Sequence, residues 1–235
     1  MQGVFITGTD TGVGKTVVAA TLAWSLARRG IAFNYIKPVE TGIPDRSTLE
    51  NLSDAARVKR AGRLADSLDE IVPFTFPEPL APLLAARRQG RILKRGTLLD
   101  EVRKRIEPHR LALVEGAGGL LAPLCPGYLV IDLIAELGLP VLVVSRTGLG
   151  AVNHSLLTLR QLEREGIEIL GLVANHCRPE PGLAEREFVS QLKEFADVEI
   201  FGELPYLAAP PENDRDWERL ASGLDLASLL ARAGR

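Results

Sequence analysis

Two glycines, a lysine and a threonine lie close together near the start of the chain, in the segment Thr9-Asp-Thr-Gly-Val-Gly-Lys-Thr16. Gly12 and Gly14 would let the backbone turn its N–H groups inward around an anion. Lys15 could then reach phosphate oxygens, and the Thr16 hydroxyl could bind Mg²⁺. An apolar run precedes the segment and a helical pattern follows it, so a helix N-terminus would add its positive dipole end. We therefore predict that this segment is a phosphate-binding loop.

The segment resembles the P-loop sequence G-x-x-x-x-G-K-[ST], with one departure. Thr9 stands where the first glycine belongs, and Gly8 is one position early. A glycine-rich turn between a strand and a helix, with no ligand, is the alternative interpretation. The order Gly-Lys-Thr between an apolar run and a helical pattern favours nucleotide binding.

A loop of this kind needs an acidic partner for its metal ion. The run Leu111–Val114 is apolar, and the sequence Glu115-Gly-Ala-Gly-Gly follows it directly. We expect the strand to end at Val114 and the Glu115 carboxylate to face the metal, with the glycines leaving room for the nucleotide. An ordinary turn with a solvated Glu115 is the alternative. Asp54, at the expected start of a helix, is a second candidate, although aspartate also caps helices.

Strands and helices alternate along the chain. Apolar runs predict strands at Val4–Thr7, Ala32–Ile36, Leu111–Val114, Pro140–Val144, Ile169–Ala174 and Glu199–Leu204. Helical patterns cover Thr16–Arg29, Asp54–Leu64, Pro82–Gln89, Leu129–Leu137, Ala151–Glu165, Leu183–Phe195 and Asp214–Ala231. This alternation predicts an α/β fold, a parallel sheet flanked by helices on both faces, with ligands at the carboxyl ends of the strands. We expect one domain over residues 1–235.

Composition excludes several classes of protein. The formal net charge is −2, which gives no broad attraction to nucleic acid or to an anionic membrane. The apolar runs are too short to span a bilayer, and the N-terminus does not resemble a signal peptide. The cysteines are Cys125 and Cys177, with no C-x-x-C motif, so free thiols in a reducing compartment fit best. We expect a cytoplasmic protein with neither nucleic-acid nor membrane partners.

Taken in order, the motifs of the chain resemble those of the dethiobiotin synthetases of biotin biosynthesis, over nearly the whole length. Each motif alone is weak, whereas the ordered set is specific. The matching segments are Thr7–Thr11, Gly14–Thr16, Lys37–Gly42, Ser53–Ala55, Val114–Gly119, Leu149–His154, Val173–Asn175 and Gly202–Leu207. The resemblance implies a P-loop NTPase-like fold and an ATP- and Mg²⁺-dependent enzyme. Such an enzyme joins the two amines of 7,8-diaminononanoate with CO₂ into a cyclic urea, through a carbamate that the γ-phosphate of ATP activates.

The resemblance also implies residue roles. Lys37 would be the catalytic cation beside the carbamate and the γ-phosphate, together with Lys15. Thr16, Asp54 and Glu115 would hold Mg²⁺. The ATP-binding set would comprise Gly12, Val13, Gly14, Lys15, Thr16, Val17, Asp54, Glu115, Gly116, Ala117, Gly118, Asn175, His176, Pro205, Tyr206, Leu207 and Glu212.

On the acceptor side, the resemblance implies that Thr41 contacts the diamine. Leu149, Gly150 and Asn153 would grip the substrate carboxylate across the interface of a homodimer. Two positions depart from the relatives. Gly12 replaces a larger residue of some relatives, and Leu83 stands where relatives often carry histidine.

A regulatory P-loop ATPase of the partitioning or septum-positioning kind is the main alternative, because it shares the fold. Such switches usually carry an extra lysine early in the loop, where this chain has Asp10. They tend to end in a membrane-seeking or DNA-binding element, whereas the predicted helix Asp214–Ala231 lacks a basic face. A second alternative is an amide-forming ATP enzyme that acts on a larger metabolite such as a corrin. Those enzymes normally carry a glutaminase domain, for which 235 residues leave no room.

Overall fold

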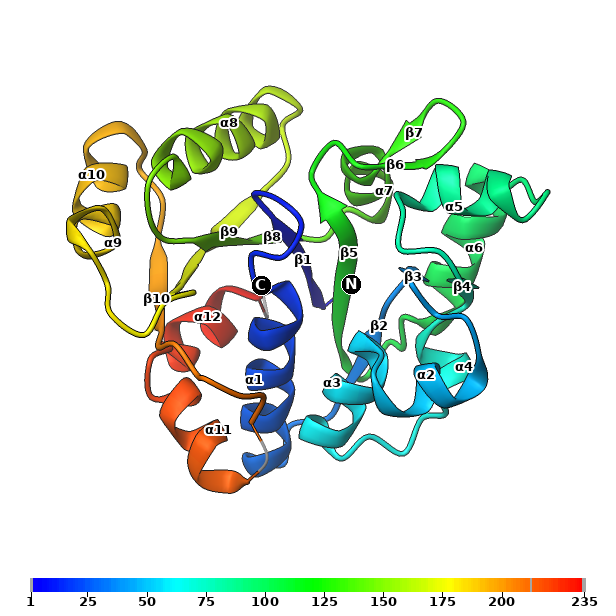
Figure 1. Ribbon diagram of the computed structural model, residues 1–235, viewed down its shortest axis with the longest axis horizontal. Coiled ribbons are helices and arrows are strands. Elements are labelled where there is room, and N and C mark those ends of the chain that lie inside the picture. Colours follow the sequence, from blue (N-terminus) through cyan, green and yellow to red (C-terminus); the bar gives the residue numbers. More distant parts are fainter. Residues whose placement is uncertain (1, 212, 234–235) are drawn as a thin grey trace.

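Parallel strands form the central sheet, in the order β10-β9-β8-β1-β5-β2 (Figure 1). This computed structural model describes residues 2–211 and 213–233. The strands are β1 (Gly3–Gly8), β2 (Phe33–Ile36), β5 (Leu111–Gly119), β8 (Val141–Arg146), β9 (Ile169–Asn175) and β10 (Ile200–Leu204). Each corresponds to one predicted apolar run. Both faces of the sheet are covered, which is why these strands are continuously apolar and do not alternate with polar residues.

Helices cover the two faces of the sheet, as predicted, and divide the core into two clusters. One face carries α1 (Lys15–Arg28), α3 (Asp54–Gly62), α11 (Asp214–Ala221) and α12 (Leu226–Ala233). The other carries α5 (Pro82–Arg88), α6 (Arg95–Arg105), α7 (Val130–Leu137), α8 (Ala151–Arg164) and α10 (Phe188–Phe195). Successive residues of β1 point to opposite faces, so Val4 and Ile6 join the first cluster while Phe5 joins the second.

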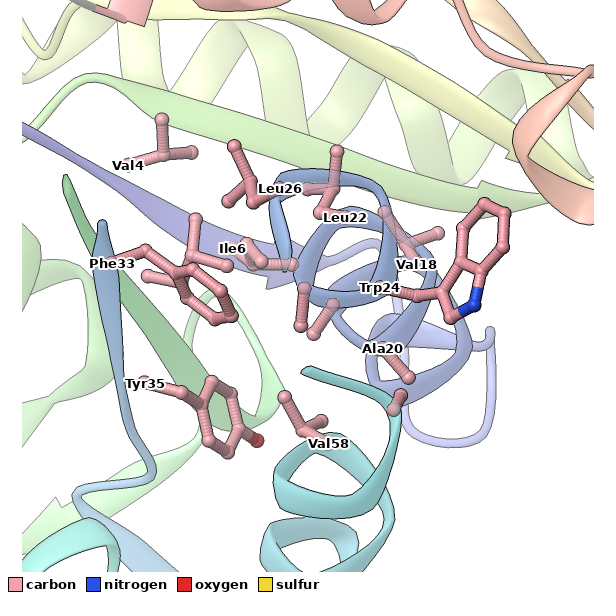
Figure 2. Close-up of a cluster of buried hydrophobic side chains, with 14 of the residues drawn as sticks. Val4, Ile6, Val18, Ala20, Leu22, Trp24, Leu26, Phe33, Tyr35 and Val58 are labelled. Atoms are coloured by element: carbon pink, nitrogen blue, oxygen red, sulfur yellow. The ribbon is translucent and has the colours of Figure 1, made fainter. Parts of the chain in front are cut away.

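Helix α1 is the most enclosed helix of the first cluster and directly follows the predicted phosphate loop. It packs against the sheet, α3 and α11, and its residues from Lys15 to Leu26 are buried apart from Val17. Figure 2 shows Val18, Leu22 and Leu26 of α1 gathered with Ile6 in the buried cluster. This packing fixes the start of α1 against the sheet, and therefore fixes the position of the first helical residues, Lys15 and Thr16.

The smaller elements lie between Val39 and Leu129, and most of them were not predicted. They include two short two-stranded sheets, β3 (Val39–Thr41) with β4 (Phe74–Phe76), and β6 (Pro123–Cys125) with β7 (Tyr128–Leu129). Two short helices, α2 (Arg46–Asn51) and α4 (Leu68–Ile71), flank α3. Together with α5, the β3–β4 pair builds one wall of the site described below.

The predicted helix Asp214–Ala231 is wrong, because the chain forms α11 and α12 with a break between them. Gly223 and Leu224 turn toward β10, where Leu224 forms a bridge with Gly202. A Cβ atom on Gly223 would lie 2.3 Å from the Glu203 carbonyl oxygen, so the close backbone contact requires glycine. The predicted helix Leu183–Phe195 is likewise two helices, α9 (Leu183–Arg186) and α10.

The two cysteines are both free thiols, as predicted. Cys125 is buried in β6, and Cys177 is exposed after β9. Burial raises the pKa of both thiols, which keeps them protonated at neutral pH. Over residues 2–211 and 213–233, no helix combines the length and the apolar character needed to cross a membrane.

Candidate active site

The loop between β1 and α1 has the backbone geometry of an anion cradle. Gly12 and Gly14 adopt positive φ values of 76° and 100°, which favour glycine. Gly14 is the N-cap of α1 and offers no side chain to the first helical N–H groups, so these groups remain available to a ligand. A Cβ atom on Gly8 would lie 2.8 Å from Val13 Cγ2. Position 8, one residue before the first glycine of the usual P-loop sequence, therefore requires glycine because the loop packs closely against it.

Lys15 begins α1 and folds back over the loop. Its ammonium lies 3.4 Å from the Asp10 carbonyl oxygen, and the residue is only 7% exposed. Burial lowers the pKa of Lys15 from its usual value, although the charge of Glu115 opposes this shift. A buried ammonium with so few partners is poised to gain from an incoming anion.

Glu115 lies inside β5 and is fully buried, so the prediction that it follows the strand is wrong. The strand continues to Gly119, because Ile6 of β1 pairs with Glu115 and Gly8 pairs with Gly119. The buried carboxylate is satisfied by donors from other elements, which is what allows its burial. Its Oε1 accepts from Thr16 Oγ1 at 2.8 Å and from Lys37 Nζ, and its Oε2 accepts from Tyr35 Oη at 2.8 Å.

Lys37 bridges the two carboxylates that were predicted to hold the metal. Its Nζ lies 2.5 Å from Glu115 Oε1 and 2.7 Å from Asp54 Oδ2. Burial would lower the pKa of Lys37, but Glu115 and then Asp54 outweigh it and raise the pKa above its usual value. Burial opposes ionisation of Asp54, yet Lys37 holds the pKa of that carboxyl below its usual value. These shifts favour the charged forms of Lys37 and Asp54, which lie together with the buried Glu115 side chain at one position.

Glu40 is a buried carboxylate of the site that sequence reasoning missed. Its two oxygens accept from the backbone N–H groups of Asp54, at 2.5 Å, and Ala55, at 3.3 Å. Ser53 caps the next donor of α3 through Ala56 N. Burial raises the pKa of Glu40 to about 7. This carboxylate joins β3 to the start of α3 and so fixes the position of Asp54. The position of Glu40 inside the motif Lys37–Gly42 is the sequence feature that could have indicated its place in the site.

A cavity of about 640 Å³ opens over the loop and brings most of the predicted site residues together. The predicted residues that line it are Gly12, Gly14, Lys15, Thr16, Val17, Lys37, Thr41, Asp54, Glu115, Ala117 and Gly118. Its wall also includes Pro79–Pro82, at the start of α5, and Arg57 of α3, together with Thr11, Val39, Glu40 and Ala122. Val13 and Gly116 are buried behind this surface.

A second group of predicted residues lies at the ends of β9 and β10 or directly after them, and does not line the cavity. Asn175, at the end of β9, donates from Nδ2 to the Val13 carbonyl oxygen at 2.9 Å. His176 Nε2 lies 2.8 Å from Glu203 Oε2. Pro205, Tyr206 and Leu207 follow β10 and are half-buried. Glu212 lies outside the described residues.

The third group lies at the start of α8, away from the cavity. Leu149 is 93% exposed, and Gly150 and Asn153 are exposed as well. Gly150 is the N-cap of α8, with a positive φ of 85°. Within this chain these residues therefore form a surface, and they do not contribute to the wall of the cavity.

Comparisons with known proteins decide the family. A family model described as an AAA domain matches residues 2–210. The ATP-dependent dethiobiotin synthetase of Anaeromyxobacter dehalogenans is 45% identical over 181 residues, covering 77% of this chain and 79% of that protein. The synthetase of Thermodesulfovibrio yellowstonii is 35% identical over 237 residues, covering 97% and 98%. The chain belongs to the ATP-dependent dethiobiotin synthetase family.

Solved structures of the partitioning and septum-positioning classes share the fold. A ParA family ATPase from Chlorobium tepidum superimposes with a TM-score of 0.53 at 14% identity, covering 99% of this chain and 97% of that one. A chain of the MinC:MinD cell division complex from Aquifex aeolicus gives 0.51 at 13% identity, covering 99% and 94%. The predicted P-loop NTPase-like fold is thereby confirmed. At these identities the likeness extends to the fold alone, whereas the synthetase family is matched in sequence as well.

Proposed function

We propose that the protein closes a cyclic urea from 7,8-diaminononanoate and CO₂, converting ATP to ADP and phosphate and giving dethiobiotin. Family membership supports this reaction, and an ATP-dependent ligase that forms carbon–nitrogen bonds is the class of enzyme to which the chain belongs. One structural observation carries the proposal further: two buried lysines, Lys15 and Lys37, line a single cavity at the mouth of the phosphate loop. A site that brings two anions together needs this arrangement.

The chemistry explains why two cations are required. A carbamate is a poor electrophile until its oxygen is phosphorylated, so the carbamate and the γ-phosphate of ATP must approach each other despite their like charge. Lys15 and Lys37 would offset that repulsion and stabilise the charge that develops in the transition state. The second amine belongs to the same substrate, so ring closure is intramolecular and its entropic cost is low. Phosphoryl transfer of this kind depends on positioning and cations, so we assign no covalent nucleophile.

The residues around Lys37 fit a Mg²⁺ ion. The Thr16 hydroxyl and the carboxylates of Asp54 and Glu115 are hard oxygen donors, and the Lys37 ammonium bonded to both carboxylates shows that this position favours positive charge. Over residues 2–211 and 213–233, no three His, Cys, Asp or Glu side chains could hold a metal together. The phosphates of ATP would then supply further ligands, as is usual for Mg²⁺. When bound, the ion would neutralise phosphate charge.

Glu115→Gln is expected to raise the Mg²⁺ concentration needed for half-maximal turnover by about tenfold or more, since a neutral amide attracts a hard cation poorly. Turnover at saturating Mg²⁺ should also fall, because the amide cannot accept from Thr16 and Lys37 as the carboxylate does. A Mg²⁺ titration of the rate measures both effects, with Glu165→Gln, at the exposed residue that follows α8, as the control. A titration curve identical to that of the parent protein would remove Glu115 from the metal site.

The nucleoside of ATP would lie beside the ends of β9 and β10. Asn175 already contacts the phosphate loop, and the half-buried loop Pro205–Leu207 follows the neighbouring strand. On the other side of the cavity, Thr41 would contact the diamine. We place this single-domain enzyme in the cytoplasm, where ATP is available and where its free thiols are suited to reducing conditions.

We further propose a homodimer in which the start of α8 completes the acceptor site of the partner subunit. The exposure of Leu149, Gly150 and Asn153 supports this proposal, because these residues do not line the cavity of their own chain and are free to contact another subunit.

Asn153→Ala is expected to raise the KM for the diamine about tenfold or more, the loss that follows removal of a hydrogen bond to a charged group, and to leave ATP binding nearly unchanged. Steady-state kinetics with each substrate varied in turn measure the difference. Gln161→Ala, further along the same helix, is the control. Sedimentation of the active protein as a monomer would contradict the shared site.

Product analysis tests the proposed reaction directly. The protein is incubated with ATP, Mg²⁺, 7,8-diaminononanoate and isotopically labelled bicarbonate, and the product is identified by mass. We expect dethiobiotin with one labelled carbon, located in the ring carbonyl. Consumption of ATP without a labelled cyclic urea would rule out the proposed reaction.

A further inference from the structure

Arg57 lies in the wall of the active-site cavity, one helical turn after Asp54 on α3. The residue is half-buried, and α3 packs along α1, the helix that begins at the phosphate loop. Arg57 also borders a second cavity of about 530 Å³ that lies between α1, α3 and the segment before α11. Arg57 therefore belongs to the walls of both cavities.

The Arg57 guanidinium has no hydrogen-bond or ion-pair partner among residues 2–211 and 213–233. The next arginine of the same helix differs in this respect. Arg60 donates to the backbone carbonyl oxygens of Glu50, at 3.1 Å, and Asn51, at 3.2 Å. The planar guanidinium of an arginine can form bidentate hydrogen bonds with a carboxylate or a phosphate. A half-buried arginine without such a partner lacks this stabilisation. The described part of the chain, residues 2–211 and 213–233, therefore gives the guanidinium donors of Arg57 no acceptor.

The charge balance of the cavity indicates what those donors could bind. The cations in its wall are Lys15, Lys37 and Arg57, and the carboxylates are Glu40, Asp54 and Glu115. Lys37 is paired with Asp54 and Glu115, and the oxygens of Glu40 accept from backbone N–H groups of α3. Among the described wall residues, Lys15 and Arg57 are thus the cations that form no ion pair with a carboxylate, although the charge of Arg57 acts on Asp54. ATP would bring several negative charges to the same cavity.

We propose that Arg57 binds the phosphate chain of ATP from α3, as a third cation in addition to Lys15 and Lys37. This inference rests on the proposed function, because it assumes that ATP occupies the cavity. The guanidinium would add bidentate, charge-assisted hydrogen bonds to phosphate oxygens. It would also tie α3, and with it the metal-binding Asp54, to the bound nucleotide.

Replacement of Arg57 tests the inference. Arg57→Gln should raise the KM for ATP about 10- to 100-fold, the loss that corresponds to one charged hydrogen-bonding group, with kcat and the KM for the diamine little changed. In Arg57→Lys the KM for ATP should rise less, since lysine keeps the positive charge but lacks the planar guanidinium that forms bidentate hydrogen bonds. The KM for ATP should also depend less on salt in Arg57→Gln than in the parent protein.

Arg60→Gln is the matched control, because Arg60 lies one turn further along α3 and borders only the second cavity. An equal rise in the KM for ATP in Arg60→Gln would show a general electrostatic effect and overturn the inference. Parent-like ATP kinetics in Arg57→Gln, or a raised KM with an unchanged salt dependence, would overturn it too. If the parent protein made dethiobiotin normally in these assays, the proposed function would survive that result. A parent protein that does not bind ATP would overturn both.

Discussion

Lys15→Ala is expected to lower the rate of dethiobiotin formation about 1,000-fold or more while the protein stays folded. Lys15 is 7% exposed, and its ammonium lies over the phosphate loop, 3.4 Å from the Asp10 carbonyl oxygen. It would be placed to stabilise charge on the transferred phosphoryl group, and loss of one such donor costs about 100- to 1,000-fold in other enzymes. Because Lys15 makes no ion pair among residues 2–211 and 213–233, its removal leaves no carboxylate of this described part without its cation.

Single-turnover kinetics and thermal unfolding of the same Lys15→Ala sample separate the two effects. The melting temperature should stay close to that of the parent protein, while the chemical step is nearly lost. Lys59→Ala is a suitable control, since Lys59 also bonds to backbone carbonyl oxygens, those of Leu64 and Asp66, but stands outside the cavity. Near-normal turnover in a folded Lys15→Ala protein would exclude the phosphate-loop assignment.

Lys37→Ala is expected to abolish product formation and, unlike Lys15→Ala, to destabilise the unliganded protein. Lys37 separates the carboxylates of Asp54 and Glu115, at 2.7 and 2.5 Å, and its removal leaves both without their cation. Breaking a buried ion pair in this way costs about 3–5 kcal/mol. Nucleotide binding should largely survive, because Lys15 and the N–H groups of the loop remain.

Two measurements distinguish these effects of Lys37→Ala. Chemical denaturation gives the loss of stability, and added Mg²⁺ should recover part of it by supplying positive charge between the two carboxylates. Calorimetry with ATP gives the affinity, which should change far less than the rate. Retention of coupled product formation by Lys37→Ala would show that this lysine is structural.

The sheet and the phosphate loop were predictable because their signals are local. Parallel strands buried on both faces form continuous apolar runs, and a loop that must adopt positive φ at Gly12 and Gly14 requires those glycines. The chemical roles of Lys15 and Thr16 follow from the same short segment. These features depend on neighbours in the sequence, so the sequence alone carries them.

The remaining features of the site depend on contacts between distant segments. Glu115 resembles a residue after a strand, and only its donors Thr16, Lys37 and Tyr35, from other elements, make a buried position inside β5 possible. Glu40 matters because α3 begins opposite it, which no local pattern indicates. The break between α11 and α12 has the same origin, a close backbone contact with β10.

Release of phosphate from ATP, measured with 7,8-diaminononanoate and bicarbonate omitted in turn, tests the central claim most directly. The claim is that Lys15, Lys37 and the metal stabilise the transition state of phosphoryl transfer only when a bound carbamate is the acceptor. We therefore predict slow hydrolysis until both compounds are present, and then one cyclic urea formed for each ADP released. Hydrolysis that ignores both compounds and rises with DNA or lipid would contradict the synthetase account and favour a regulatory ATPase of the same fold.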